Sequence, residues 1–314
     1  MKPLPLVLLL LLLAFLLVAP WVFPSSYVRH LFILAFIYAI VASNWDLSQG
    51  YGGIFNFGHL AFFALGGYTS AILAKNFEVN PWLAVLAAGV IPALASLLIV
   101  LPVVRLKGIY VILVTFAFSQ LCLQLVLSQA KVTGGSSGIV LVPPLGLGSY
   151  DFSTDTKLAY YFTALLLLII STVFLRYLVN SDFGLSVQAL RDNEDYAIAR
   201  GVPLARTRLL TLVLSSIFTG LAGGFYSIYL RVISPDIFSF GLMSTVLGML
   251  LLGGLSTIYG SILAALILTF VSEALIGLGP VRHLIIASLM VLVLRMLPGG
   301  LYTVFGRSLT GRGG

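Results

Sequence analysis

The side chains that could do chemistry in this chain are few, and many of them lie in one window. Of the 17 Lys and Arg and 10 Asp and Glu residues, nine fall between Arg176 and Arg208. Inside that window, Arg191 to Gly201 reads R-D-N-E-D-Y-A-I-A-R-G. Residues 193–199 contain few helix breakers, and the glycine after them can end a short helix. A short mixed-charge helix is typical either of a surface that contacts another molecule or of a solvated connecting loop.

The sequence lacks the residue patterns of the common enzyme sites. There is no G-x-x-x-x-G-K-[ST] phosphate loop and no H-E-x-x-H zinc motif, and His30, His59 and His283 are far apart. No nucleophile elbow or paired-carboxylate site is recognisable, so we expect neither catalysis nor a cofactor or metal. The single cysteine, Cys122, excludes an intrachain disulfide and a cysteine metal site.

The composition is that of a membrane protein. The chain is 60% hydrophobic and 9% charged, with a mean hydropathy of +1.11, whereas soluble domains carry roughly 25% charged residues. Backbone groups in lipid must be hydrogen-bonded internally, and a helix needs about 20 apolar residues to cross. We therefore predict an all-α, polytopic protein in contact with membrane lipid. The net charge of +7 fits basic loops beside a membrane and does not indicate nucleic acid.

The hydrophobic runs predict about ten transmembrane helices, including possible broken or re-entrant ones, in one transmembrane domain, residues 1–314. Their ranges are 3–28, 32–46, 54–74, 82–104, 109–130, 158–175, 209–230, two helices within 237–272, and 283–294. The run 237–272 is free of charge and too long for one helix. Its L-G-G-L-S-T-I-Y-G segment divides it into two helices, or into a re-entrant half-helix and a full one. The first run is read as a retained helix, with a signal peptide as the alternative.

Two polar segments must lie outside the membrane, at about 131–157 and about 180–206. With the N-terminus in the cytoplasm, ten alternating spans place 11 Lys and Arg residues inside and 6 outside. The positive-inside rule therefore predicts that the N-terminus and the 180–206 loop are cytoplasmic, and that the 131–157 loop is extracytoplasmic.

Charge inside the spans is nearly absent, with Asp46 and Glu273 as the only candidates, both near span ends. A carrier coupled to protons or sodium usually needs such groups. Glycines are abundant instead, in Gly50 to Tyr68 and again in Leu251 to Gly260. They allow either broken helices that expose backbone groups to a polar solute or simply close helix packing. The candidate solute-path residues are Gly50, Tyr51, Gly53, Gly58, His59, Phe62, Gly66, Tyr68, Gly253, Gly254 and Gly260. His59 alone is more typical of a hydrogen-bonded core histidine.

Several motifs, in consistent order from about residue 35 to 275, together resemble the LivM/LivH-type permeases of ATP-binding-cassette importers, and LivM more closely. They are G-Y-x-G-x-x-x-x-G-H-x-A-F-F-x-x-G-x-Y from Gly50, R-L-K-G-I-Y-V-I-L-V-T-F-A-F from Arg105, T-G-G-S-S-G from Thr133, F-G-L-S-V-Q-A-L-R-D-N-E from Phe183, L-A-G-G-F-Y from Leu221, S-P-D-x-F-S-F from Ser234, and L-L-G-G-L-S-T-I-Y-G from Leu251.

The resemblance implies the membrane subunit of an importer for branched-chain or related amino acids, in the plasma (inner) membrane. Its expected partners are a second permease subunit, two ATP-binding subunits and an extracytoplasmic solute-binding protein. The polar loop would be the coupling helix that docks on the ATPase, through Arg191, Glu194, Asp195, Ala197 and Gly201. Importer permeases carry E-A-A-x-x-x-G there, and this chain has D-Y-A-I-A-R-G, so two positions match and two depart.

The expected mechanism is alternating access, in which ATP-driven closure of the partner ATPases moves the coupling helix and the adjoining spans rotate as rigid bodies. The alternative is an ion-coupled secondary transporter or channel for a small polar solute. No residue in the sequence selects among leucine-type amino acids, other amino acids, amides and urea.

Overall fold

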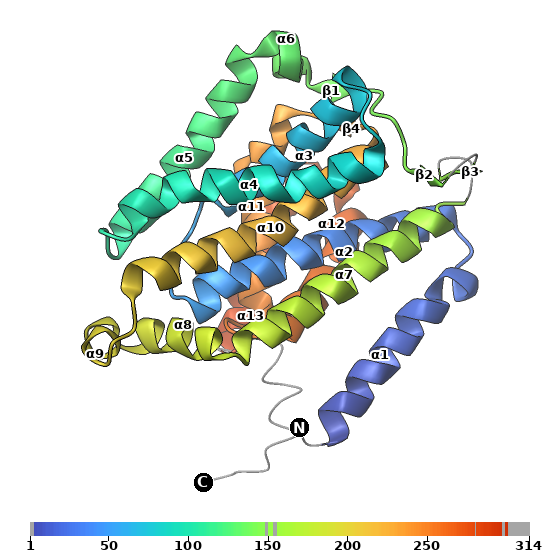
Figure 1. Ribbon diagram of the computed structural model, residues 1–314. Coiled ribbons are helices and arrows are strands. Elements are labelled where there is room, and N and C mark those ends of the chain that lie inside the picture. The colour runs from blue at the N-terminus through green and yellow to red at the C-terminus, as the bar shows by residue number, and fades with distance from the viewer. Residues whose placement is uncertain (1–2, 148–149, 153–155, 280, 297–298, 301–314) are drawn as a thin grey trace.

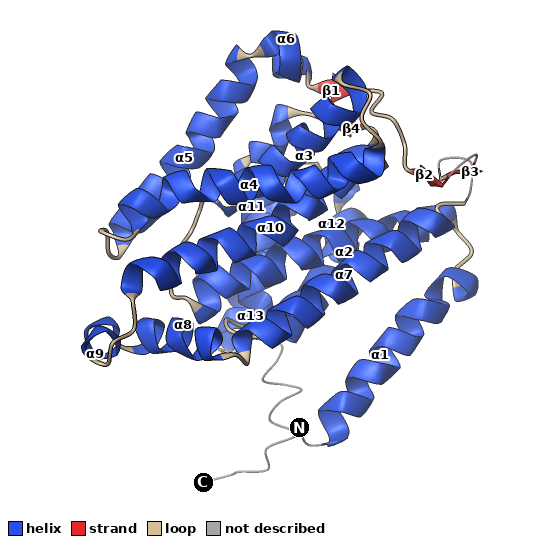
Figure 2. Ribbon diagram, in the orientation of Figure 1, coloured by secondary structure: helices blue, strands red, loops and turns tan. Residues whose placement is uncertain are grey.

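The computed structural model describes the chain except residues 1–2, 148–149, 153–155, 280, 297–298 and 301–314. It is a bundle of helices, with short strands and loops gathered at its two ends (Figures 1 and 2). The main helices are α1 Pro3–Val22, α2 Ser26–Asp46, α3 His59–Asn76, α4 Pro81–Val103, α5 Ile109–Ser128, α7 Leu158–Val179, α10 Leu204–Leu230, α11 Phe240–Gly253, α12 Ile258–Ala274 and α13 Val281–Met296. Each of the ten predicted spans falls on one of these helices, which confirms an all-α polytopic fold.

The smaller elements lie in the connections. They are a π-helix η1 Leu47–Tyr51, α6 Ala130–Thr133, α8 Asp182–Asp192, α9 Glu194–Ala199, and the 3₁₀ turns η2 Gly135–Ser137, η3 Pro235–Phe238 and η4 Ile276–Leu278. Two antiparallel pairs join β1 Ile139–Val140 to β4 Val232–Ile233 and β2 Gly146–Leu147 to β3 Tyr150–Asp151. The pairing of β1 with β4 fastens the predicted 131–157 loop to the end of α10.

Among the described residues, five helices are long and apolar enough to cross a membrane by length and composition. They are Ser26–Tyr51, Pro81–Val103, Ile109–Ser128, Leu158–Val179 and Leu204–Leu230. Shorter apolar helical stretches are Leu12–Val22, Phe240–Gly253, Ile258–Ala274 and Leu284–Val293. The chain is therefore a multi-pass membrane protein.

Two predicted spans include several residues that are not helical, and two others begin earlier than predicted, α2 at Ser26 and α10 at Leu204. The first run does not continue to residue 28, because Pro24 cannot extend a helix: α1 ends at Val22 and α2 begins at Ser26. The third helix starts at His59 and not at residue 54. The side chain of Asn56 accepts the backbone N–H of Gly58 at 2.9 Å and so favours a turn there over a helix.

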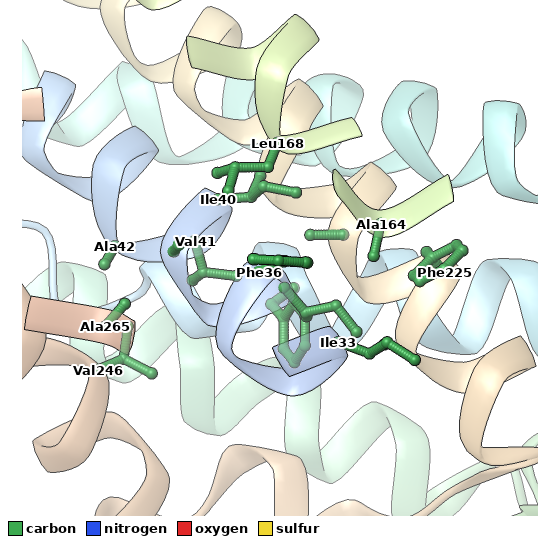
Figure 3. Packing of buried hydrophobic residues seen from close by; sticks show 14 of the residues in the cluster. Ile33, Phe36, Ile40, Val41, Ala42, Ala164, Leu168, Phe225, Val246 and Ala265 are labelled. Atoms are coloured by element: carbon green, nitrogen blue, oxygen red, sulfur yellow. The ribbon is translucent and has the colours of Figure 1, made fainter. Parts of the chain in front are cut away.

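Helix α2 forms the centre of the bundle. In its 26-residue span with η1, 89% of the most apolar window is buried, against 28% for α5 at the edge. Figure 3 shows its side chains, including Phe36 and Ile40, packed among residues of α7, α10, α11 and α12. The segments on either side of α2 therefore lie within reach of most of the other helices.

The connections separate into two groups at opposite ends of the bundle (Figure 1). One end holds α6, the β-strands and the start of α7. The other holds the α4–α5 turn, α8, α9 and the α11–α12 break. Basic residues lie at both ends. Lys75 and Arg231 bind carbonyls of the 131–157 loop at the first end, and Lys107 and Arg208 lie near α9 at the second.

Candidate functional site

The polar window folds as two short helices at the second end of the bundle, and the predicted helix over 193–199 is confirmed as α9. The side chain of Asn193 caps α9 by accepting the N–H of Tyr196 at 3.0 Å. Gly201 follows α9 with φ at +90°, a conformation that favours glycine, and a Cβ there would meet nothing within 4 Å. Local capping and a left-handed glycine thus define this helix.

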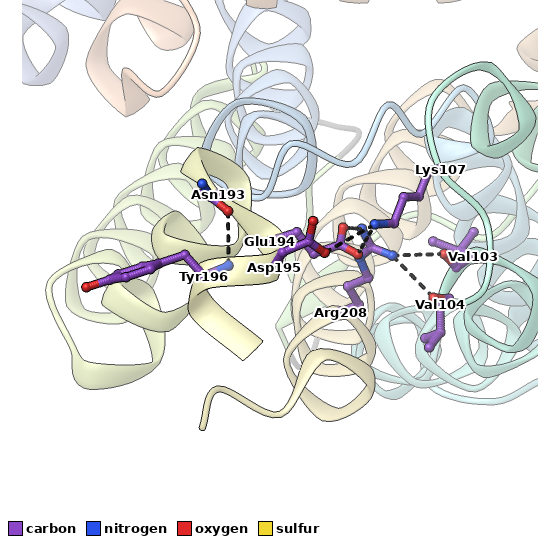
Figure 4. Close-up of polar contacts among 8 residues, drawn as sticks. All are labelled: Val103, Val104, Lys107, Asn193, Glu194, Asp195, Tyr196 and Arg208. Carbon is purple, nitrogen blue, oxygen red and sulfur yellow. Dashed lines mark hydrogen bonds and ion pairs between the residues drawn. The ribbon is translucent and has the colours of Figure 1, made fainter. Parts of the chain in front are cut away.

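Glu194 fastens α9 to the rest of the protein (Figure 4). Its carboxylate binds Nζ of Lys107 at 3.0 Å and Nη2 of Arg208 at 2.7 Å, and its side chain is 18% exposed. Arg208 also donates to the carbonyls of Val103 and Val104 at 3.4 and 3.3 Å. One acid thus joins α9, the α4–α5 turn and the N-terminal part of α10.

These contacts also affect Lys107. Its pKa is raised, chiefly because it donates a hydrogen bond to Glu194, with a further contribution from the charges of Glu194 and Asp195. The Asp195 carboxylate lies 3.7 Å from Lys107 and its side chain is 91% exposed. Glu194 therefore holds α9 in place, and we call its contacts with Lys107 and Arg208 the α9 clamp. Asp195 faces solvent.

The outward face of α9 is formed by exposed side chains, among them Asp195, Tyr196 and Ile198. The guanidinium of Arg200 lies over the ring of Tyr196 and donates to its hydroxyl at 2.7 Å. Ala197, which matches the family motif, is only 2% exposed and points into the protein. The residues available to a partner are thus largely those at which the sequence departs from the motif.

Arg191, at the end of α8, joins two segments that are far away in sequence. Its Nη1 donates to the carbonyl of Gly50 at 3.1 Å and to Oγ of Ser256 at 2.6 Å. The first lies in η1 and the second in the break between α11 and α12. We call these two contacts the Arg191 bridge. The same guanidinium holds the neighbouring Asp192 at 2.8 Å.

Behind the Arg191 bridge lies the buried carboxylate of Asp46. Its Oδ1 accepts the backbone N–H of Ser256 at 2.9 Å. A Cβ on Gly50 would collide with that carboxylate and with the Ser256 backbone, so glycine is required where η1 crosses the break. Asp46, Gly50, Ser256 and Arg191 therefore form one connected polar group that ends at the polar loop.

A cavity of about 230 Å³ opens beside this group. It is lined by the backbone of Gly53 and by side chains from α8, α9, the α4–α5 turn and α10, among them Lys107, Arg191, Glu194 and Arg208. Gly53 has φ at +63°, and a Cβ there would lie 2.9 Å from Cγ of Arg191. The structure thus brings Gly50 and Gly53, predicted for the solute path, against Arg191 and Glu194, predicted for coupling.

The other candidate path residues are buried between helices. His59 is fully buried, with Nε2 at 2.8 Å from Oγ1 of Thr219 and its ring stacked on Trp45 at 5.5 Å. Gly58 lies against the backbone of Thr115. Phe62 is fully buried and Tyr68 is 3% exposed, while Tyr51 is partly exposed.

Three of the predicted glycines make close backbone approaches. Gly66 of α3 packs on the Gly220 backbone of α10, and Gly253 packs on Gly260 across the α11–α12 break. A side chain at any of these positions would overlap backbone atoms. Gly254, with φ at +98°, ends α11. For these positions the observed contacts are those of close packing.

Sequence reasoning missed the residues that complete these contacts, above all Ser256, Lys107 and Arg208. It did single out Asp46, because an acid near a buried span is rare.

Buried polar atoms without a hydrogen bond in the described part of the chain gather on the same stretch, on Asn44, Trp45, Asp46, Gln49, Asn56 and His59. Within the same described ranges, no cluster of three His, Cys, Asp or Glu residues could hold a metal ion.

Comparisons with known proteins agree on one family. The family described as "Branched-chain amino acid transport system / permease component" matches residues 27–294. The high-affinity branched-chain amino acid transport system permease protein LivM is 29% identical over 289 residues in both Salmonella typhimurium and Escherichia coli, covering 85% of this chain and 68% of each relative. The LivH permease protein of Salmonella typhimurium is 26% identical over 291 residues, covering 84% and 90%. No solved structure matches the chain significantly.

Proposed function

This chain belongs to the permease family of branched-chain amino acid transport systems, and on that premise we propose that it forms half of the membrane channel of an importer powered by separate ATPases. It pairs with a second permease of the same family, receives an amino acid from an extracytoplasmic binding protein and releases it into the cytoplasm. Branched-chain amino acids are the proposed substrate, because the relatives' names specify them. Catalysis of ATP hydrolysis is assigned to the partners.

The observation that carries the proposal is the construction of α9. It presents Asp195, Tyr196 and Ile198 outward, while Glu194 fastens it to the transmembrane helix α10 and to the α4–α5 turn. A displacement of this face therefore moves α10 and the α4–α5 turn together. We assign ATPase contact to the outward residues and the transmission of movement to Glu194 and Arg191. Ala197 and Gly201 shape the helix.

The proposed orientation puts α8 and α9 in the cytoplasm and the β-strands outside. The single native cysteine, Cys122, is buried, so a Cys122→Ser background is suited to labelling. In intact cells, a membrane-impermeant maleimide should label a cysteine placed at the exposed Leu141 and should label one placed at Asp195 only after lysis. Labelling of Asp195→Cys before lysis would contradict this orientation and indicate the opposite one.

The functional test uses the chain co-purified with its partners and reconstituted in proteoliposomes. We expect leucine uptake that requires ATP and the binding protein and persists without an ion gradient. Tyr196→Asp should abolish solute-stimulated ATP hydrolysis, because it removes an exposed aromatic ring from the outward face of α9, to which we assign the ATPase contact. Phe77→Ala is the matched control, since Phe77 is 68% exposed but lies at the end of α3 that is far from α9. Uptake by the purified chain alone on an ion gradient would establish the carrier alternative.

A further inference from the structure

Helix α1 stands at the side of the bundle (Figure 1). An apolar groove lies between α1 on one side and α7 and α12 on the other. The groove has a volume of about 200 Å³. Leu12 and Leu16 line it from α1, and Leu165 and Ile169 line it from α7. Nothing in the proposed transport cycle uses this groove, which lies away from the α9 clamp.

The upper part of α1 closes the groove at one end. The hydroxyl of Tyr161 donates to the carbonyl of Leu16 at 2.6 Å, and the rings of Trp21 and Phe162 lie 5.6 Å apart. These contacts hold α1 next to α7. A further helix, about 10 Å wide with its side chains, has no room between two helices joined in this way. The occupant must be narrower.

The length of the groove matches one leaflet of a bilayer. Leu165 is the eighth of the 22 residues of α7, about one turn before its middle, and Arg176 lies near the end of α7 at the α8 side. At a rise of about 1.5 Å per residue, these positions are roughly 16 Å apart. Half of a hydrocarbon core of about 30 Å is roughly 15 Å. The groove therefore runs from the bilayer middle to the level of the lipid headgroups on the α8 side.

Arg176 gives the headgroup end of the groove a positive charge. Its Nη1 donates to the hydroxyl of Tyr259 at 2.5 Å and its guanidinium lies 5.9 Å from the centre of that ring, so its position is fixed. A guanidinium has five N–H donors in a planar fork that matches phosphate. None of the groove-lining residues in the described part of the chain is acidic. Next to Arg176, Tyr177 is 76% exposed, as is typical of aromatic residues at a membrane surface.

We propose that this groove binds an anionic phospholipid, with one acyl chain between α1 and α7 and the phosphate on Arg176. The apolar walls fit a hydrocarbon chain, the depth fits one leaflet, and the charge at the open end selects an anionic headgroup over a zwitterionic one. The lipid would fasten α1 to the bundle.

The experiment is native mass spectrometry of the full chain, purified with its partners in detergent and titrated with dioleoyl phosphatidylglycerol or dioleoyl phosphatidylcholine. We expect tighter binding of phosphatidylglycerol. Arg176→Gln should weaken it by about tenfold, because a charge-assisted phosphate contact is lost. Arg295→Gln is the matched control, because Arg295 is also exposed near the α8 side but lies on α13, outside the groove. Leu13→Trp should fill the groove and weaken binding of both lipids, even if Arg176→Gln does not fold.

Three results would overturn the site. One is equal affinity of the wild-type complex for the two lipids. The second is equal loss of binding in Arg176→Gln and Arg295→Gln, which indicates general attraction to basic residues. The third is unchanged binding in Leu13→Trp. Displacement of phosphatidylglycerol by inorganic phosphate at millimolar concentration would also contradict the acyl-chain contact, because the headgroup alone would then account for binding.

Discussion

The Arg191 bridge predicts that Arg191→Gln will uncouple ATP hydrolysis from solute uptake. Arg191 ties the end of α8 to Gly50 in η1 and to Ser256 in the α11–α12 break. Glutamine is shorter and neutral, so it cannot reach both acceptors. The contact between Asp46 and the Ser256 backbone does not involve Arg191, so the inner part of the polar group stays in place. The substitution therefore removes the connection from the polar loop to η1 and to the α11–α12 break.

The expected loss can be worked from the two hydrogen bonds. A bond from a charged donor contributes about 1.5–3 kcal/mol. Because the Arg191 side chain is 32% exposed, solvent screening reduces each bond to about 1 kcal/mol. Two bonds then give about 2 kcal/mol, or roughly a 30-fold change in the equilibrium between connected and disconnected arrangements, since about 1.4 kcal/mol is tenfold.

The assay measures leucine uptake and ATP hydrolysis in the same proteoliposomes and reports their ratio. In Arg191→Gln we expect ATP hydrolysis to persist and the uptake per ATP to fall several-fold. Arg105→Gln is the matched control, because it removes the same charge from an exposed position in the α4–α5 turn. Ser256→Ala, which removes one acceptor, should cause a smaller fall. The double variant should lose less than the sum of the single variants, because both act on one contact.

An unchanged uptake-to-ATP ratio in Arg191→Gln would refute the bridge as a coupling element. A parallel loss of uptake and hydrolysis, with the complex still assembled, would refute it as well, because the arginine would then act at the ATPase contact. Strictly additive effects of Arg191→Gln and Ser256→Ala would show that the two residues act separately.

The remaining predictions concern packing, the α9 clamp and the buried acid. Gly66→Ala should lower the unfolding temperature of the purified protein, because overpacking costs about 1–3 kcal/mol, while Gly277→Ala, with no atom within 4 Å of the new Cβ, should not. Glu194→Gln should speed amide hydrogen exchange in α9 and return the raised pKa of Lys107 toward its ordinary value. In the wild type Lys107 is charged at neutral pH, and this pairing is lost as the pH rises through that raised pKa. Asp46→Asn should keep ATP-driven uptake, whereas Asp46→Leu should reduce it by leaving a buried N–H of the α11–α12 break unpaired, at about 1–3 kcal/mol.

The sequence was sufficient to predict the helices because each hydrophobic run is long and bounded by charge, proline or glycine. It predicted α9 for the same local reasons, since Asn193 caps it and Gly201 ends it. The break between α11 and α12 was also predictable, because a run of 36 residues without a charge, 237–272, exceeds one span. The boundaries at Pro24 and His59 were missed because the apolar composition continues through them.

The connections between distant segments could not be predicted. Arg191 and Gly50 are 141 residues apart, and Arg191 and Ser256 are 65 apart. Nothing in the local sequence distinguishes Ser256 from other serines. The motif register suggested Ala197 as a contact residue, but the rotation of α9 is set by Glu194, which binds Lys107 and Arg208 and turns Ala197 inward. Side-chain direction on a short helix is fixed by its tertiary contacts.

The close glycine contacts and the Arg191 bridge together constrain how the chain can move. Gly66 packs on Gly220 and Gly253 packs on Gly260 with no room for a Cβ, so we expect α3 with α10, and α11 with α12, to move as units. In the proposed transport cycle, force from α9 enters such a unit through Glu194 and Arg191. Because Asp46 accepts a backbone N–H inside the same group, its carboxylate oxygen holds the break in place, a task that an asparagine oxygen can also perform. An ion carrier would need the negative charge itself. Measuring uptake by Asp46→Asn therefore distinguishes transport driven by ATP from transport driven by an ion gradient.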